Sequence, residues 1–169
     1  MGWSSTSYTK TGLDASGSVG SFSDLQNNAY DKSSPWFYCD WGSRSQYSGT
    51  AWMTGSEMTD IVNVILLAKN DSSTQNHLAQ PDKANPDGVD TWSADRVRQE
   101  LKNRGVTSFS SISSISVNAD FGSGSTTTVN ISGDGGSQSV SGNDFKNYFN
   151  LRAPSNINIV GPLFNIEQR

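Results

Sequence analysis

One cysteine, Cys39, and one histidine, His77, are all that the 169 residues contain of either type. A lone cysteine cannot form an internal disulfide, so cysteine usage does not indicate the redox compartment. A zinc ion held by Cys39 and His77 would lack the second pair of ligands that a structural site needs. We therefore expect a buried, unreactive thiol, no metal ion and no other cofactor.

Long apolar runs and charge of one sign are also scarce. The one long apolar run, residues 61–68, is interrupted by Asn63 and is far too short to span a membrane. Twelve basic and sixteen acidic residues give a net charge of −4, with no basic stripe interleaved with aromatics. The charge pattern disfavours nucleic acid and anionic membranes as partners.

The N-terminus lacks the charged and then apolar pattern of a signal peptide. Met1-Gly2 is followed directly by sequence typical of the interior of a longer chain, so we expect an upstream portion to be missing. Abundant Ser, Thr, Asn and Gly with few Lys are typical of an exported bacterial protein. This composition predicts an extracytoplasmic location.

Aromatic residues are well represented, with five Trp, five Tyr and seven Phe along the chain. They supply enough burial for one core, and the length is that of a single domain, residues 1–169. Residues 1–53 form an extended region rich in Ser, Gly and aromatics. Within it, residues 35–41 pack four aromatics into seven positions, which favours a short buried strand.

Aromatic rings of this region are also the candidate glycan-binding residues, because such rings stack on sugar faces. The alternative is that they form the core of a domain poor in Leu. The candidates are Trp36, Tyr38, Trp41 and Trp52.

Residues 54–105 are predicted to be the helical part. Thr54 and Glu57 form a capping box, and apolar residues at helical spacing predict an amphipathic helix over 55–69 with one buried face. Ser93 is among several N-cap candidates for a second amphipathic helix that ends near Arg104, where Gly105 can adopt a left-handed cap.

Residues 111–166 are predicted to hold a β-hairpin, a short helix capped by Ser141 and a final strand over 156–160. Thr126, Thr128 and Asn130 are expected to share one face of the second strand. The fold class that follows is α+β, a small antiparallel sheet with two to three amphipathic helices packed on it.

The order of features in residues 139–166, a strand, a capped helix and a second strand, resembles the C-terminal part of the stage II sporulation protein D family of bacterial cell-wall enzymes. Residues 5–7 (Ser-Thr-Ser) and 34–36 (Ser-Pro-Trp) are similar to two further stretches of that family, in the same order. The resemblance implies peptidoglycan glycan strands as the substrate class.

The resemblance also implies a lytic transglycosylase reaction, in which one Glu, kept protonated by burial, protonates the glycosidic oxygen. In the family that Glu lies upstream of the Ser-Thr-Ser stretch, and this chain has no such segment. Tyr8 follows Ser7 where the family has paired glycines. We therefore assign no catalytic residue and expect a non-catalytic portion that supports or extends a peptidoglycan-binding groove.

Two motifs have a structural and a functional interpretation. Ser56-Glu57-Met58 is similar to the family's catalytic Ser-Glu-Met, but Glu57 is also the capping residue. Residues 85–90 look like a calcium loop, yet Lys83 and Ala94 stand where ligands belong, which favours a turn.

Two other hypotheses stay open. The first is an exported surface domain on the same scaffold that mediates protein–protein interaction. The second is a complete enzyme whose Asp or Glu residues the sequence does not single out.

Overall fold

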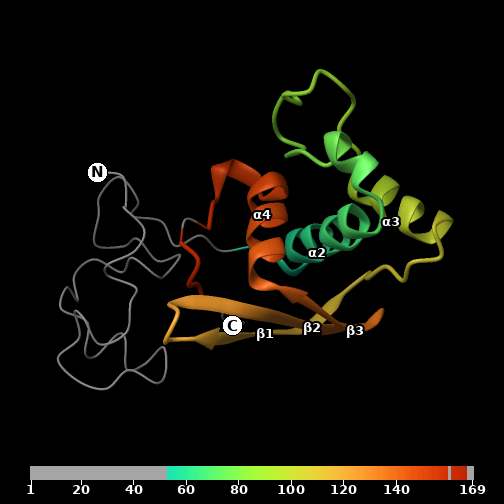
Figure 1. Cartoon of the computed structure of the whole chain (residues 1–169). Coiled ribbons are helices and arrows are strands. Elements are labelled where there is room, and N and C mark those ends of the chain that lie inside the picture. The colour runs from blue at the N-terminus through green and yellow to red at the C-terminus, as the bar shows by residue number, and fades with distance from the viewer. Residues whose placement is uncertain (1–52, 160, 167–169) are drawn as a thin grey trace.

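The computed structural model describes residues 53–159 and 161–166. A three-stranded antiparallel sheet carries helices α2 and α4 on one face, while α3 lies farther from the sheet (Figure 1). The predicted α+β class is confirmed. The predicted glycan-binding residues Trp36, Tyr38, Trp41 and Trp52, and also Cys39, lie outside the described residues.

Helix α2 (Gly55–Asn70) begins at the predicted capping box. The Glu57 N–H donates to Thr54 Oγ1 at 3.3 Å, and the Thr54 N–H donates to Glu57 Oε2 at 2.7 Å. Both hydrogen bonds satisfy amides that the first helical turn leaves without partners. The helix therefore starts where the sequence predicts and ends one residue later than predicted.

The predicted face of α2 is buried, and a second side of the helix, which the sequence analysis did not predict, is buried as well. Ile61, Val62 and Ile65 pack in the core between the helices and the sheet, together with Val129, Ile131, Phe145 and Phe149. Val64, Leu67 and Ala68, on another side of the helix, pack in a second cluster with Leu78, Val97 and Leu101. Helix α2 is thus the central element that joins the sheet to α3.

Helix α3 (Ala94–Asn103) follows a 3-10 helix, η2 (Ser72–His77), and the loop 78–92. Ser93, one of several candidates that the sequence offered, caps it by accepting a hydrogen bond from the Arg96 N–H at 3.2 Å. Arg104 is the C-cap of the helix. The next residue, Gly105, has a φ of +69°, the left-handed conformation that glycine adopts without strain.

The sheet has the order β1-β2-β3, formed by β1 (Ile112–Asp120), β2 (Ser125–Gly133) and β3 (Gly136–Ser141). Helix α4 (Gly142–Arg152) follows β3 with no linker, and Ser141 caps it by accepting from the Asp144 N–H at 3.0 Å. This short connection holds α4 against the sheet.

The predicted final strand is absent from the described residues after α4. A 3-10 helix, η3 (Pro154–Asn156), turns the chain instead, with Ser155 at a φ of 55°. The following segment is held by side chains: Asn150 exchanges two hydrogen bonds with the backbone of Ile159, at 2.9 and 2.7 Å. Thr126 Oγ1 likewise donates to Phe164 O at 2.7 Å and accepts from its N–H at 2.9 Å.

No helix in the described ranges is both long and apolar enough to cross a membrane.

Candidate functional site: the polar face of the sheet

The face of the sheet opposite the helices is lined by short uncharged polar side chains. Val129, Ile131 and Val140 point into the core, so their neighbours along β2 and β3 point to the other face. The strand register aligns these neighbours with residues of β1 in three rows. The rows are Ser114, Ser132 and Ser137; Ser116, Asn130 and Ser139; and Asn118, Thr128 and Ser141.

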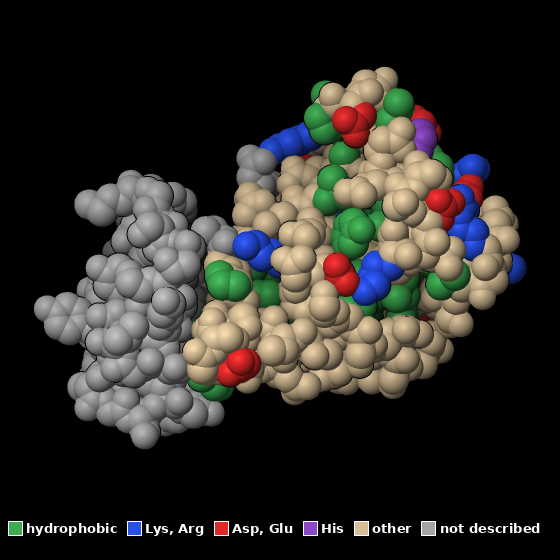
Figure 2. All heavy atoms as spheres, in the orientation of Figure 1, with side chains coloured by type: hydrophobic (Ala, Val, Ile, Leu, Met, Phe, Trp, Pro, Cys, Tyr) green, Lys and Arg blue, Asp and Glu red, His purple; other side chains and the backbone are tan. Residues whose placement is uncertain are grey.

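We call these nine residues the polar face; the last of them, Ser141, also accepts the capping hydrogen bond of α4. The six on β1 and β3 are exposed, and the three on the central strand are half-buried between their neighbours. Along the sheet, at the lower side of Figure 2, the surface is mostly neither hydrophobic nor charged, whereas charged side chains gather over the helical part. The polar face is therefore a chemically uniform surface of hydroxyl and amide groups.

Hydrogen bonds join β2 to β3 across this face. Ser139 Oγ donates to Asn130 Oδ1 at 2.7 Å, and the hydroxyls of Ser132 and Ser137 lie 3.0 Å apart. Cross-strand pairs of this kind fix the side chains in place and add a few tenths of a kcal/mol each, roughly. These four side chains of β2 and β3 are thus ordered in advance of any ligand.

The β1 side of the polar face is different. Within the described part of the chain, the side chains of Ser114, Ser116 and Asn118 are exposed and make no hydrogen bond. Neighbouring strands are about 4.8 Å apart, and successive residues on one face of a strand are about 6.7 Å apart. The nine side chains therefore form a lattice of donors and acceptors with spacings on the scale of one sugar ring.

Two carboxylates flank this lattice, one at each end of the hairpins. A hydrogen bond from the Ser123 hydroxyl lowers the pKa of Asp120, and a hydrogen bond from the Ser111 backbone N–H lowers the pKa of Asp134. Both carboxylates are therefore ionised at neutral pH and already serve the local turns. Neither has the raised pKa that a general acid for glycoside cleavage requires.

Glu57, the one candidate acid that the sequence suggested, caps the start of helix α2. Besides the Thr54 N–H, its Oε2 accepts from the Thr54 hydroxyl at 2.8 Å. Both hydrogen-bond partners of Glu57, an N–H and a hydroxyl, belong to Thr54. A Glu at the third position of a helix makes such capping hydrogen bonds, which explains why Glu57 stands at the start of α2. The capping interpretation of Ser56-Glu57-Met58 is confirmed.

His77 has partners that the sequence did not indicate. Its ring stacks on Trp92 with centroids 4.6 Å apart and planes 8° apart, and its Nδ1 lies 2.9 Å from Asp90 Oδ1. The Arg96 guanidinium lies 5.4 Å from the centroid of the Trp92 ring. Trp92 is thus engaged by neighbours that close the loop 78–92, and it does not offer an open platform for a sugar.

Residues 85–90 form the turn that the sequence favoured over a calcium loop. Asn85 Oδ1 accepts from the Asp87 N–H at 2.9 Å, and Asn85 Nδ2 donates to Asn76 O at 2.8 Å. Gly88 has a φ of +68°. Across residues 53–159 and 161–166, no group of three or more His, Cys, Asp or Glu side chains could hold a metal ion.

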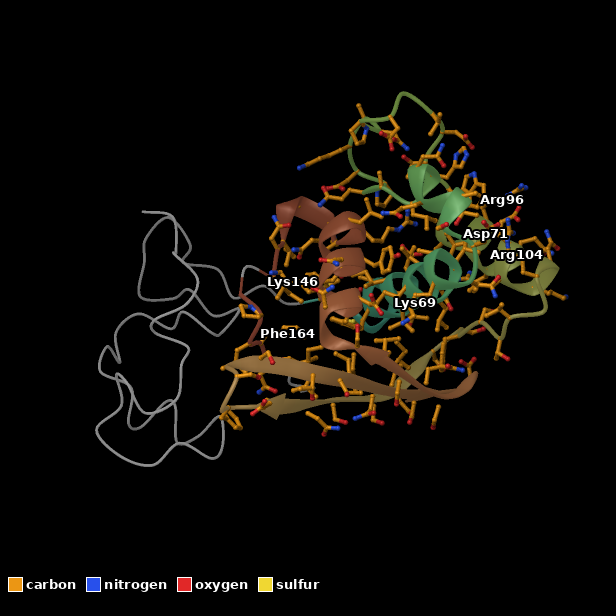
Figure 3. All side chains as sticks on the ribbon, in the orientation of Figure 1. Lys69, Asp71, Arg96, Arg104, Lys146 and Phe164 are labelled. Atoms are coloured by element: carbon orange, nitrogen blue, oxygen red, sulfur yellow. The ribbon has the colours of Figure 1, made fainter. Side chains whose placement is uncertain are left out.

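The strongest cluster of charges lies in the helical part, away from the polar face. Figure 3 places Asp71, Arg96 and Arg104 around η2 and α3. Arg104 donates to Asp71 Oδ2 at 2.9 Å and also pairs with Glu100, whose other oxygen lies 2.6 Å from Arg96. A hydrogen bond from Arg104 lowers the pKa of Glu100. These charges neutralise one another and tie η2 to α3.

Compared with known proteins, the chain matches no family model, no curated protein and no solved structure.

Proposed function

We propose that this chain is a non-catalytic, glycan-binding portion of an extracytoplasmic bacterial cell-wall protein. It would support or extend a peptidoglycan-binding groove, as its resemblance to the stage II sporulation protein D family implies. The observation that carries the proposal is the polar face, nine uncharged hydroxyl and amide side chains in three rows.

The chemistry of the polar face suits a glycan strand. Sugar hydroxyls and acetamido groups both donate and accept hydrogen bonds, as do Ser, Thr and Asn side chains. Uncharged groups are stripped of water at lower cost than ions, which favours a neutral ligand. Because no aromatic ring is among the nine residues, each sugar is expected to bind weakly, and affinity should grow with the length of the strand.

The proposed lack of turnover rests on the carboxyl groups. Cleavage of a glycosidic bond needs a carboxylic acid that stays protonated near neutral pH. Among the described carboxyl groups, the shifted pKa values, those of Asp71, Glu100, Asp120, Asp134 and Asp144, are all lowered. The family's acid-bearing segment also has no counterpart in the sequence.

Binding and product release with purified peptidoglycan, both intact and stripped of stem peptides, test this function. We expect retention of the chain without release of anhydro products. The variant Ser116→Ala/Asn118→Ala removes two exposed polar side chains of β1 and should weaken retention about 30-fold, since each of two hydrogen bonds contributes about 1 kcal/mol. The matched control Asn70→Ala/Ser72→Ala makes the same chemical change on exposed residues of the helical part.

The outcomes separate the hypotheses. Equal retention of the two double variants would remove the polar face from the binding site. Release of anhydro products would contradict the non-catalytic assignment, and Glu57→Gln would then be the first substitution to assay. If the chain is not retained and releases no product, the second function remains, an exported domain that binds another protein.

One observation favours that second function. The inward-pointing side chains of β1, Ile115 and Val117, are only half-buried, whereas Val129 and Ile131 on β2 are 0% and 1% exposed. Partly exposed apolar residues along a sheet edge are a common feature of protein interaction surfaces.

A further inference from the structure

The outer edge of β1 has the properties of a strand that pairs with another strand. Within the described residues, β1 has a neighbour on one side only, because the sheet order is β1-β2-β3. Its nine residues, Ile112–Asp120, contain no Lys, Arg or Pro, and the single charge, Asp120, stands at the end. Protein edges are normally protected by such charges, by proline or by short strands.

The opposite edge makes a useful comparison. Strand β3 has six residues, begins at Gly136 and has one buried apolar side chain, Val140. A short strand rich in Gly and Ser is a weak template for pairing. The longer β1, with its half-buried apolar side chains, is therefore the edge at which a partner gains most by pairing.

The sequence of β1 is compatible with pairing to itself. Its register to β2 is regular between the two irregularities at residues 112–114 and 118–119. In an antiparallel pair centred on Ser116, Ile115 of one copy stands opposite Val117 of the second. Ser114 then faces Asn118, and the two Asp120 carboxylates lie at opposite ends of the pair.

We propose that two copies of this chain pair antiparallel through their β1 edges to form a continuous six-stranded sheet. The isologous contact covers the half-buried Ile115 and Val117 of both copies on the helical side. On the other side, the two polar faces become one face of twice the width. The dimer itself does not depend on the proposed function, and only its consequence for glycan binding rests on it.

The expected affinity is low. Pairing of one short strand from each copy buries less than the roughly 1,200 Å² of a stable protein interface. We therefore expect a dissociation constant on the order of 100 μM. Two joined faces would bind a long glycan strand more tightly than one, because the second contact becomes intramolecular.

Sedimentation velocity of the full chain, without glycan, from about 10 to about 500 μM tests the dimer. We expect the sedimentation coefficient to rise with concentration. In Ser116→Lys, two lysines would meet across the two-fold axis, and like charges directly opposite each other destabilise a strand pair. This variant should remain monomeric over the whole range.

Ser139→Lys is the matched control, since Ser139 is an exposed serine in the same row of the polar face but on β3. It should dimerise like the unmodified chain, and circular dichroism should show that both variants keep the fold. A monomer at every concentration, or a dimer that persists in Ser116→Lys, overturns the proposal. Because no glycan is present, these outcomes leave the proposed function to its own test.

Discussion

Arg152 has the largest fully buried side chain of the described part. Its side chain, 1% exposed, lies in the last turn of α4 and donates from Nε and Nη2 to the two oxygens of Asp60, at 2.7 and 3.2 Å. It also donates to the backbone oxygens of Ala79 and Trp92, both at 3.0 Å. One guanidinium thereby joins α4, α2 and both ends of the loop 78–92.

Replacing Arg152 should be far more damaging than breaking an exposed ion pair. Arg152→Met leaves Asp60 partly buried without its counter-charge, and we expect the free energy of unfolding to fall by about 3 kcal/mol or more. Lys69→Met breaks the exposed pair with Asp144, 2.6 Å long, and should change stability by less than about 1 kcal/mol. Urea denaturation of both variants measures the difference. Similar losses would contradict the assigned role of Arg152.

Among the elements, the junction between β3 and α4 is the most tightly fitted. A Cβ atom added to Gly142 would lie 1.9 Å from the backbone oxygen of Thr126, so only glycine fits where α4 starts beside β2. The close approach also explains how α4 can follow β3 without a linker. Gly55, the first residue of α2, has no atom within 4 Å of its added Cβ.

These two glycines therefore predict opposite outcomes for the same substitution. Gly142→Ala must displace α4 from the sheet, and we expect it to lower stability by about 3 kcal/mol. Gly55→Ala removes backbone freedom at an open helical position and should be neutral or stabilise by up to about 0.5 kcal/mol. Thermal unfolding of the pair is the measurement. A tolerated Gly142→Ala would show that the close packing at this junction is not needed.

At the scale of the whole molecule, carboxylates link elements that lie far apart in the sequence. Asp134 accepts from the backbone N–H groups of Ser110 and Ser111, at 2.9 and 3.0 Å, and so holds the start of β1 to the turn between β2 and β3. Asp144 joins α4 to Lys69 of α2. A hydrogen bond from Lys69 lowers the pKa of Asp144, and backbone hydrogen bonding by Ser111 lowers that of Asp134.

Stability should therefore decrease in acid. Each of these Asp pKa values is lower in the folded chain than its ordinary value of 3.8. The stabilisation is then complete above the unfolded pKa and is lost as the pH falls through the folded pKa. Asp134→Asn cannot ionise, so it should be less stable than the unmodified chain at neutral pH, with a gap that narrows toward about pH 3. Urea midpoints across this range test it, and a gap that stays constant contradicts it.

The sequence by itself determined the features that depend on near neighbours. The capping box at Thr54, the left-handed Gly105 and the cap at Ser141 lie where the sequence predicts them, and the cap at Ser93 is one of the several candidates that the sequence offered. Each depends on hydrogen bonds or backbone freedom within a few residues, and such interactions are encoded locally. The α+β class followed from the change of apolar period from helical to strand spacing.

The candidate site was only partly accessible from the sequence. Thr128 and Asn130 point to the polar face as the alternation predicts, but Thr126, expected beside them, is buried at 5% exposure. The irregularity between Asn118 and Ala119 shifts the register there, so the alternation is broken. The three rows themselves require a register between strands, and a single sequence does not specify it.

Tertiary structure alone decided the remaining features. The burial of α2 on two sides, the stacking of His77 on Trp92 and the four contacts of Arg152 all join residues distant in sequence. The segment after α4 follows the side chains of Asn150 and Thr126 instead of a strand ladder. Local propensity cannot predict such contacts, because their free energy is gained only when the separate elements pack together.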